Sequence, residues 1–354
     1  MKLSKFPYLV QKEIFAEMNN QDSFSFSFIS KKMRQLIKST QSERLKSISF
    51  INYKRSQVKT AIVGIVFKNG EEEDVLVLDE RSATVAGKLI DFLYIDTHTF
   101  RHPLFASFHT RNKEYAIRCF HNCFLYIFGD SVKYQWFENC YKTPIPQLQN
   151  VSSFITLLNI GLRDDDMDMV ETFFSSSPIP KWVKVTNVTE ETELSPESKF
   201  YQAESVTVDK IDQTAPAALR YFHGRLAFLK CCSCKALDLI EFINRWKSGE
   251  AYQKLEYLQF RISHLECKIA KFPENKILSS TGAKRIDSTK KPPTHILPKL
   301  YDYYDQNRNT EPITSHAYVV RASDNRVASV QFQPNTFLFG VWDKTEEEFL
   351  KMIE

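Results

Sequence analysis

Glycine is scarce in this sequence, which has 9 glycines in 354 residues. No G-x-G string and no G-K-[ST] string occurs anywhere in the chain. Dinucleotide-binding, P-loop and kinase proteins need such strings, because only glycine lets the backbone approach phosphate groups closely. These three classes of phosphate-binding site are therefore excluded.

Long apolar runs and a large excess of one charge are also missing. No stretch of 18 apolar residues occurs, and Lys2, Lys5 and Lys12 interrupt the N-terminal region. We therefore expect neither a membrane span nor a signal peptide, and no membrane partner. The net charge is only +4, from 47 basic and 43 acidic residues. Nucleic acid is consequently not the expected partner.

The cysteines do not form a disulfide framework, since there are seven of them, an odd number, at irregular spacing. This usage indicates a reducing compartment, so we expect a location in the cytoplasm or nucleus. The length and the hydrophobic content of 43% predict an ordinary folded protein of two or three domains.

The first segment, residues 6–37, has the spacing of short helices. Pro7 fits the first turn of a helix, where the missing N–H costs nothing. Val10, Ile14 and Met18 follow at intervals of four and form one apolar stripe.

Two more short helices follow in this segment. Asp22 or Ser23 is expected to cap the second helix, which has Phe24 and Phe28 four residues apart. Ser30 is expected to cap a third helix that contains Met33, Leu36 and Ile37.

About 40 residues are too few to form an independent core. The surplus apolar surface of this segment has two possible destinations, the rest of this chain or a groove on a partner protein.

The order of these residues resembles the F-box motif. Phe6-Pro7 stands where that family has leucine-proline, and Ser30-Lys31 matches its serine-lysine step, while Met33 replaces a frequent tryptophan. The resemblance covers about a tenth of the chain and implies an F-box over residues 3–40. It implies docking onto a Skp-type adaptor, and through it onto a cullin scaffold. The contact residues would be Phe6, Pro7, Val10, Ile14, Met18, Phe24, Phe28, Ser30, Lys31, Met33 and Leu36.

Residues 45–145 are predicted to be a β-rich connecting segment. Residues 45–51 alternate as a half-buried strand does, and the apolar runs 61–67 and 75–78 flank an Asn-Gly turn signal, which predicts a hairpin. We also expect strands over 115–128 and 132–137.

Residues 150–350 show four similar apolar strings. Their second apolar positions fall at 183, 206, 229 and 258, steps within the range of leucine-rich repeats. The interpretation is an irregular leucine-rich-repeat-like α/β array, and a non-solenoid α/β domain with parallel strands is the alternative. Tyr318 to Trp342 contains two turn signals and is expected to form an antiparallel meander that caps the array.

A second resemblance falls within this region. Residues 234–249, followed by Lys254-Leu-Glu-Tyr-Leu, are similar to the F-box-associated (type 2) region of nematode F-box families. An aliphatic helix, a tryptophan, a short loop and a leucine-aromatic-leucine strand occur there in that order. The resemblance implies that this region recruits a protein substrate.

One His/Cys cluster suggests a different chemistry. His98, His102, Cys119, His121 and Cys123 lie within 26 residues, and on a strand the last three would share one face. His98 and His102 are four residues apart and could share a helix face, but Pro103 follows them and no H-E-x-x-H glutamate is present. Ordinary packing is therefore the preferred interpretation and a zinc-dependent protein the weaker alternative.

The sequence therefore predicts an α+β or α/β fold with a three-helix F-box, a β-rich segment, a repeat-like array and a β meander. The hypothesis is a substrate-recognition subunit of an SCF-type (Skp, cullin, F-box) ubiquitin ligase, without its own active site, cofactor or metal. Its partners would be a Skp-type adaptor, a cullin and an unknown protein substrate. The alternative is a non-catalytic repeat scaffold whose N-terminal helices cap its own array.

Overall fold

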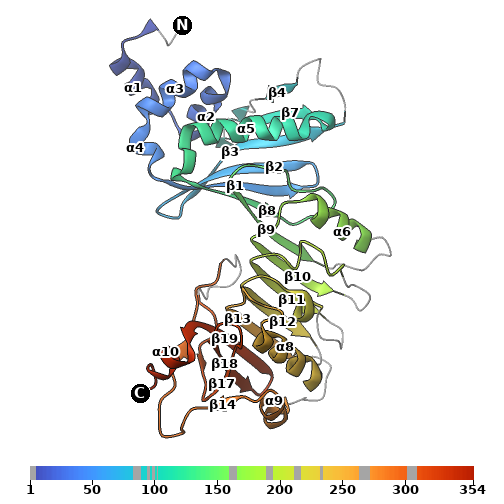
Figure 1. Cartoon of the computed structure of the whole chain (residues 1–354). Coiled ribbons are helices and arrows are strands. Elements are labelled where there is room, and N and C mark those ends of the chain that lie inside the picture. The colour runs from blue at the N-terminus through green and yellow to red at the C-terminus, as the bar shows by residue number, and fades with distance from the viewer. Residues whose placement is uncertain are drawn as a thin grey trace. The chain divides into compact units, whose positions relative to one another are not determined.

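The computed structural model divides the chain into two compact units, Met1–Phe154 and Ile155–Glu354 (Figure 1). We call them unit 1 and unit 2, and β9 (Val151–Leu158) contains the point of division. The structure describes residues 5–82, 89–93, 96–97, 100–101, 103–158, 166–188, 194–210, 217–231, 234–262, 272–300 and 309–354.

Unit 1 begins with helices, as the sequence predicts. None of the helices in the described ranges has the length and apolar character that a membrane crossing requires. The helices of unit 1 are α1 (Tyr8–Glu17), α2 (Asn20–Ile29), α3 (Lys31–Thr40), α4 (Ser42–Leu45) and α5 (Lys113–Phe128).

The sheet of unit 1 is mixed, with strands in the order β8-β1-β2-β3-β7-β4. β1, β2 and β3 are antiparallel to one another, whereas β8 runs parallel to β1 and β7 parallel to β3. The predicted hairpin is confirmed as β2 and β3, and Gly70 in its turn has a φ of 91° that favours glycine. The strands are β1 (Ile48–Gln57), β2 (Thr60–Phe67), β3 (Glu72–Arg81), β4 (Ile90–Leu93), β7 (Leu104–His109) and β8 (Lys133–Glu138), with a separate pair, β5 (Asp96–Thr97) and β6 (Phe100–Arg101).

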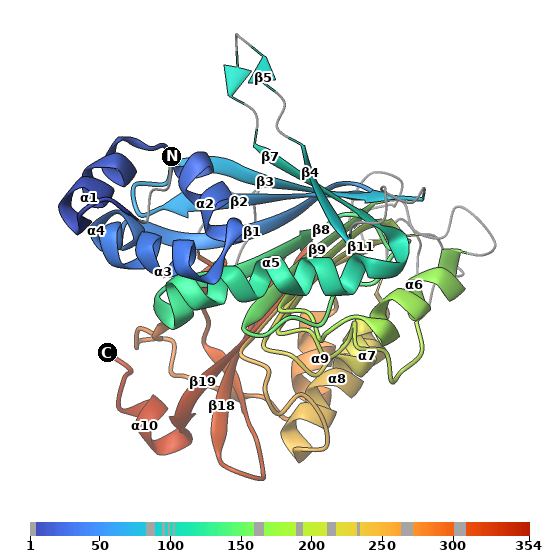
Figure 2. The same cartoon turned by 90° about the horizontal axis from the view of Figure 1, so that it is seen from above.

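The predicted strand over residues 115–128 is wrong, because these residues form helix α5. The segment is rich in aromatic residues, which favour strands locally. Its buried positions nevertheless recur with the helical period, so tertiary packing decides the outcome. In Figure 2, α5 runs beside α3, with which it is in contact.

The core of unit 1 contains aromatic and charged side chains. Tyr53 stacks on Trp136 with ring centroids 5.5 Å apart, and both residues are buried. The buried Arg55 donates from Nε to Glu138 Oε2 at 2.6 Å, and Trp136 Nε1 donates to the same oxygen at 3.2 Å. This ion pair ties β1 to β8.

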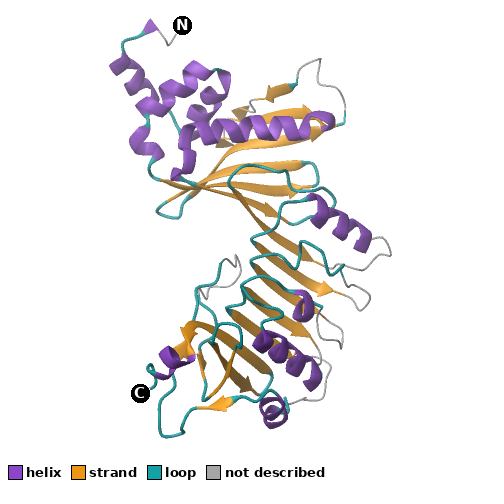
Figure 3. Cartoon of the chain, in the orientation of Figure 1, coloured by secondary structure: helices purple, strands orange, loops and turns teal. Residues whose placement is uncertain are grey.

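Unit 2 contains four parallel strands that are neighbours in the order of the chain, and Figure 3 shows them side by side. They are β10 (Trp182–Val188), β11 (Ser205–Lys210), β12 (Leu226–Cys231) and β13 (Tyr257–Ile262).

The register corrects one part of the repeat alignment. Val183 aligns with Val206, then with Ala227 and not with Leu229, and then with Leu258. The expected third position was therefore displaced by two residues, because the small Ala227 occupies a slot for which a larger aliphatic residue was expected. Because side chains of a strand alternate between its two faces, an error of two residues leaves the expected position on the correct face. Membership of the leucine-rich-repeat class stays a prediction.

An antiparallel meander follows the parallel strands. β19 (Thr336–Thr345) pairs with β13, and β18 (Arg326–Gln333), β17 (Ala317–Val320) and β14 (Lys284–Arg285) follow outward in that order. The predicted meander therefore lies at the end of the parallel strands and pairs with the last of them. A small separate pair is formed by β15 (Thr294–His295) and β16 (Ile313–Thr314).

Helices lie against the sheet of unit 2. Phe242 and Trp246 of α8 contact Phe339 of β19, at ring-centroid distances of 5.1 Å each. Gly249 ends α8 with a φ of 77°, as the sequence predicts. The helices of this unit are α6 (Asp166–Ser176), α7 (Ala218–Tyr221), α8 (Ala236–Ser248), α9 (Glu274–Ser280) and α10 (Glu346–Leu350).

Candidate functional site

Two of the N-terminal helices, α2 and α3, begin at a polar residue whose side chain caps the helix. The side chain of Asn19 accepts a hydrogen bond from the backbone N–H of Asp22 at 2.7 Å, so Asn19 caps α2. The expectation of Asp22 or Ser23 as this cap is wrong, because the helix begins earlier. Ser30 Oγ accepts from the N–H of Met33 at 3.2 Å and caps α3, as expected.

The inner face of these helices packs on this chain. Phe24 is 2% exposed, and its ring lies 5.7 Å from that of Phe124 on α5. Phe28, half-buried, meets Phe120 of the same helix edge-on at 5.0 Å. Part of the surplus apolar surface therefore packs against unit 1, the first of the two destinations considered above.

Polar contacts fix α2 and α3 in the same position. Asn20 Nδ2 donates to Glu73 Oε2 at 2.6 Å, and Gln21 Nε2 donates to the carbonyl of Asp74 at 2.9 Å. Lys38 Nζ donates to the carbonyl of Tyr126 at 2.7 Å. These bonds join α2 to β3 and α3 to α5, so the helices and the sheet of unit 1 form one folded body.

The same helices also expose large apolar side chains. Leu9 is 72% exposed, Ile29 68%, Tyr8 52% and Val10 40%. Exposed apolar side chains of this size in a short segment indicate a surface that binds a partner. We call Tyr8, Leu9, Val10 and Ile29 the outer apolar residues.

The sequence-predicted contact residues divide into three groups. Pro7, Val10, Ser30 and Lys31 are exposed, and Phe24 is buried. Phe24 cannot meet a partner while it packs on Phe124, so it is not among the exposed residues. The remaining predicted residues are half-buried, namely Phe6, Ile14, Met18, Phe28, Met33 and Leu36.

Tyr8, Leu9 and Ile29 were missed by the sequence reasoning. A signal for Leu9 was present, because it shares a helix face with Glu13 and Glu17 at intervals of four. Both glutamates are exposed, and a leucine on such a face must be exposed as well. Nothing comparable marks Ile29 in the sequence.

The His/Cys cluster does not assemble into a metal site in the described residues. His98 and His102 lie outside the described residues, while Cys119, His121 and Cys123 lie on α5, a helix and not a strand. Across the described ranges, no group of three or more His, Cys, Asp or Glu residues could hold a metal ion.

Both ring nitrogens of His121 already have hydrogen-bond partners. Nδ1 lies 2.8 Å from the hydroxyl of Tyr53, and Nε2 lies 2.8 Å from the carbonyl of Gln149. Burial lowers the pKa of His121, because the charged imidazolium is poorly solvated there. These contacts give His121 a structural role, in which it links β1 to the chain before β9.

Comparison with known proteins finds one match, the F-box domain family over residues 3–45. No curated protein and no solved structure matches the chain. The matched segment includes α1, α2 and α3, which contain all four of the outer apolar residues. F-box domains bind Skp-type adaptors within cullin complexes, so the match implies adaptor binding in an SCF-type ubiquitin ligase. The chain carries an F-box domain, and this supports its identification as an F-box protein.

Proposed function

We propose that this chain is a substrate-recognition subunit of an SCF-type ubiquitin ligase. The observation that carries the proposal is the outer apolar surface of the F-box helices, with Leu9 and Ile29 about two-thirds exposed or more. The adaptor covers this surface, and burial of a few such anchors supplies most of the binding energy. The mechanism is positional, because the chain holds a target near the ubiquitin-loaded enzyme and raises its effective concentration there.

Unit 2 recruits the protein substrate in this proposal. The resemblance of residues 234–258 to the F-box-associated region of nematode families supports it, and so does the order of the chain, with the F-box first. The leucine-rich-repeat-like interpretation of β10 to β13 belongs to the same proposal. We place the protein in the cytoplasm or nucleus, because its cysteine usage indicates a reducing compartment.

The alternative of a plain repeat scaffold, with N-terminal helices that only cap its own array, receives less support. In the described residues, α2 and α3 pack on β3 and α5 of unit 1. A helix layer with a purely structural role would not need to expose Leu9, Val10 and Ile29.

The structure also determines which experiment can distinguish a ligase subunit from a plain repeat scaffold. Deletion of residues 1–40 would uncover Phe120, Phe124 and Phe128 of α5 and cause aggregation under either function. Point variants of exposed residues avoid this problem. Val10 and Val58 are both 40% exposed, and Val58 lies in the turn between β1 and β2.

The test is co-expression with a Skp-type adaptor, followed by size-exclusion chromatography. We expect the wild type and the control variant Val58→Asp to elute with the adaptor. The double variant, which combines Leu9→Asp with Val10→Asp, should elute without it. Circular dichroism should show the same folded content in all variants. Equal co-elution of both variants with the adaptor, or no co-elution of the wild type, would contradict the proposal.

A further inference from the structure

Unit 2 contains a groove of about 630 Å³ at the beginning of strands β12 and β13. This volume lies within the range of ligand pockets in proteins. Its walls come from the residues before these two strands, from β15 and the residues after it, and from the end of β19. All of these elements belong to unit 2.

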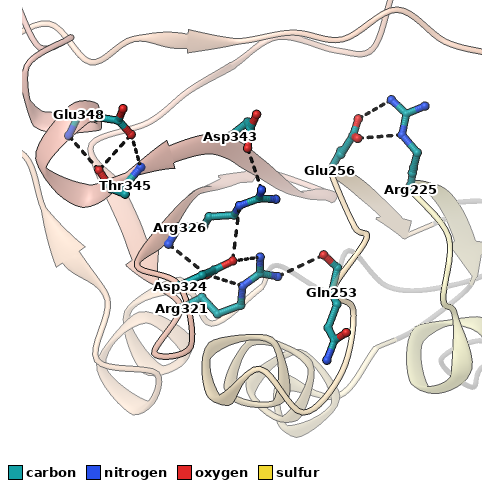
Figure 4. Close-up of polar contacts among 9 residues, drawn as sticks. All are labelled: Arg225, Gln253, Glu256, Arg321, Asp324, Arg326, Asp343, Thr345 and Glu348. Atoms are coloured by element: carbon teal, nitrogen blue, oxygen red, sulfur yellow. Dashed lines mark hydrogen bonds and ion pairs between the residues drawn. The ribbon is translucent and has the colours of Figure 1, made fainter.

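The charged wall of the groove includes a paired arginine. Arg225 donates from Nε and Nη2 to the two carboxylate oxygens of Glu256, both at 2.7 Å, and from Nη1 to Glu204 at 2.5 Å. Figure 4 shows the fork between Arg225 and Glu256. Glu204, Arg225 and Glu256 each precede a strand, so this polar row crosses the start of β11, β12 and β13.

A second arginine is paired in the same way. Arg326 lies 2.8 Å from Asp343 through Nη2 and 3.4 Å from Asp324 through Nε. Figure 4 shows Arg326 between these two carboxylates. The groove carboxylates Glu256 and Asp343 are therefore each paired with an arginine, which reduces their repulsion of an incoming acid but does not cancel it, because each arginine is shared with a second carboxylate.

Lys254 is the cation of the groove that stays available. Its side chain is exposed, and it makes no ion pair within the part of the chain that the structure describes. Beside it the groove is apolar. Ile296 is 46% exposed, Leu297 and Trp342 are half-buried, and the indole N–H of Trp342 is already bonded to Ser329 at 2.9 Å.

We propose that this groove binds an acidic segment of a partner protein, in which a carboxylate side chain stands next to an aliphatic or aromatic one. The carboxylate pairs with Lys254, and the neighbouring apolar side chain packs on Ile296 and Trp342. Charge complementarity selects an acidic over a basic segment. The proposal rests on the proposed function, since it names the kind of segment that unit 2 would recruit.

The probe is a displayed library of random twelve-residue peptides, selected on the immobilised full chain. We expect enriched peptides to place Asp or Glu beside Leu, Ile, Phe, Tyr or Trp. Enrichment of basic peptides, or no enrichment at all, overturns the proposal.

Enriched peptides are then titrated against two matched pairs of variants by fluorescence anisotropy. Lys254→Glu should weaken binding at least about tenfold, while Lys276→Glu, the same change at an exposed lysine of α9, should leave it unchanged. Ile296→Asp should weaken binding, and Leu237→Asp, at an exposed leucine of α8, should not. Equal effects within a pair overturn the proposal.

Adaptor co-elution of the same variants distinguishes failure of the proposed function from failure of the groove proposal. Lys254→Glu should still elute with the Skp-type adaptor, because Lys254 lies in unit 2 and the F-box helices lie in unit 1. Failure of the wild type to co-elute would remove the proposed function. If Lys254→Glu leaves the peptide affinity unchanged while adaptor binding is intact, only the groove proposal is removed.

Discussion

Phe24 of α2 and Phe124 of α5 lie with their ring centroids 5.7 Å apart, and both side chains are buried. One residue belongs to the F-box helices and the other to the segment that follows them by about a hundred positions. The contact shows that the F-box helices share a core with the rest of unit 1. In the proposed function, stability therefore depends on buried side chains of these helices such as Phe24, and adaptor binding on exposed ones such as Leu9.

The first prediction compares a buried and an exposed side chain of these helices. Phe24→Ala should lower the free energy of unfolding by about 3–5 kcal/mol, because it leaves a cavity against Phe124 and Phe128. Leu9→Ala removes a side chain that is 72% exposed and should change stability by less than about 0.5 kcal/mol. Denaturant unfolding of the full chain measures both effects. Similar losses for the two variants would mean that Phe24 is not in the core.

The second prediction concerns the buried ion pair of unit 1. Arg55→Ala should destabilise the chain by about 3–5 kcal/mol, since it leaves the Glu138 carboxylate buried without its cation. Burial raises the pKa of Glu138, whereas Arg55 lowers it, so loss of Arg55 favours the protonated carboxyl. The double variant Arg55→Met with Glu138→Gln should recover a large part of the loss.

The exposed pair Lys46–Glu43, with side chains 69% and 85% exposed, provides the control. Lys46→Ala should cost less than about 1 kcal/mol, because water already screens this pair. A double-mutant cycle on Arg55 and Glu138 gives the coupling directly. A coupling as small as that of the exposed pair would contradict the prediction.

The third prediction concerns the end of α8. Gly249 has a φ of 77°, and an added Cβ would lie 2.8 Å from Ser323 Oγ. Gly249→Ala should therefore destabilise the chain by about 1–3 kcal/mol through strain and collision. Gly70 has a φ of 91° with nothing within 4 Å of an added Cβ, so Gly70→Ala measures the strain alone. Thermal melts of the two variants should differ, with Gly249→Ala lower.

The fourth prediction is a pH dependence. In the folded chain burial lowers the pKa of His121 below its ordinary value, so the neutral ring is favoured. The stability that this provides is complete above the unfolded-state pKa, about 6.5, and is lost as the pH falls through the lowered folded-state pKa. The wild type should therefore lose stability between pH 7 and pH 5.

The variant His121→Gln isolates this contribution. It should be less stable than the wild type at pH 7 but lose less on further acidification. The raised pKa values of Asp74 and Glu138, both due mainly to burial, act in the opposite direction but are common to both proteins. His316→Gln, at an exposed histidine, should keep the wild-type pH dependence. An identical pH dependence for His121→Gln would remove His121 as its source.

Local signals made several elements predictable from the sequence. The hairpin of β2 and β3 follows from two apolar runs around an Asn-Gly turn, and the end of α8 follows from Gly249. The cap Ser30 followed from the same kind of local chemistry. Each of these signals depends on neighbouring residues alone, which is why the sequence was sufficient.

Elements that depend on distant contacts were harder. Helix α5 was expected as a strand, because Phe120, Phe124 and other aromatic residues favour strands locally, while Phe24 and Phe28 of α2 complete its packing. The slot of Ala227 was missed because the alignment followed large aliphatic residues. The candidate site was predicted as a segment. The face that Leu9 shares with Glu13 and Glu17 marks it as exposed, whereas the burial of Phe24 depends on its distant contact with Phe124.

The passage from the F-box helices to the first strand contains no long connection. α3 ends at Thr40, α4 occupies Ser42–Leu45 and β1 begins at Ile48, while Lys38 is bonded to the carbonyl of Tyr126. Such a short and anchored passage leaves little room for a hinge. An adaptor bound to the helices would thus fix the orientation of the sheet of unit 1. The connection between α3 and β1 would not allow the sheet to rotate relative to the adaptor to accommodate targets of different size.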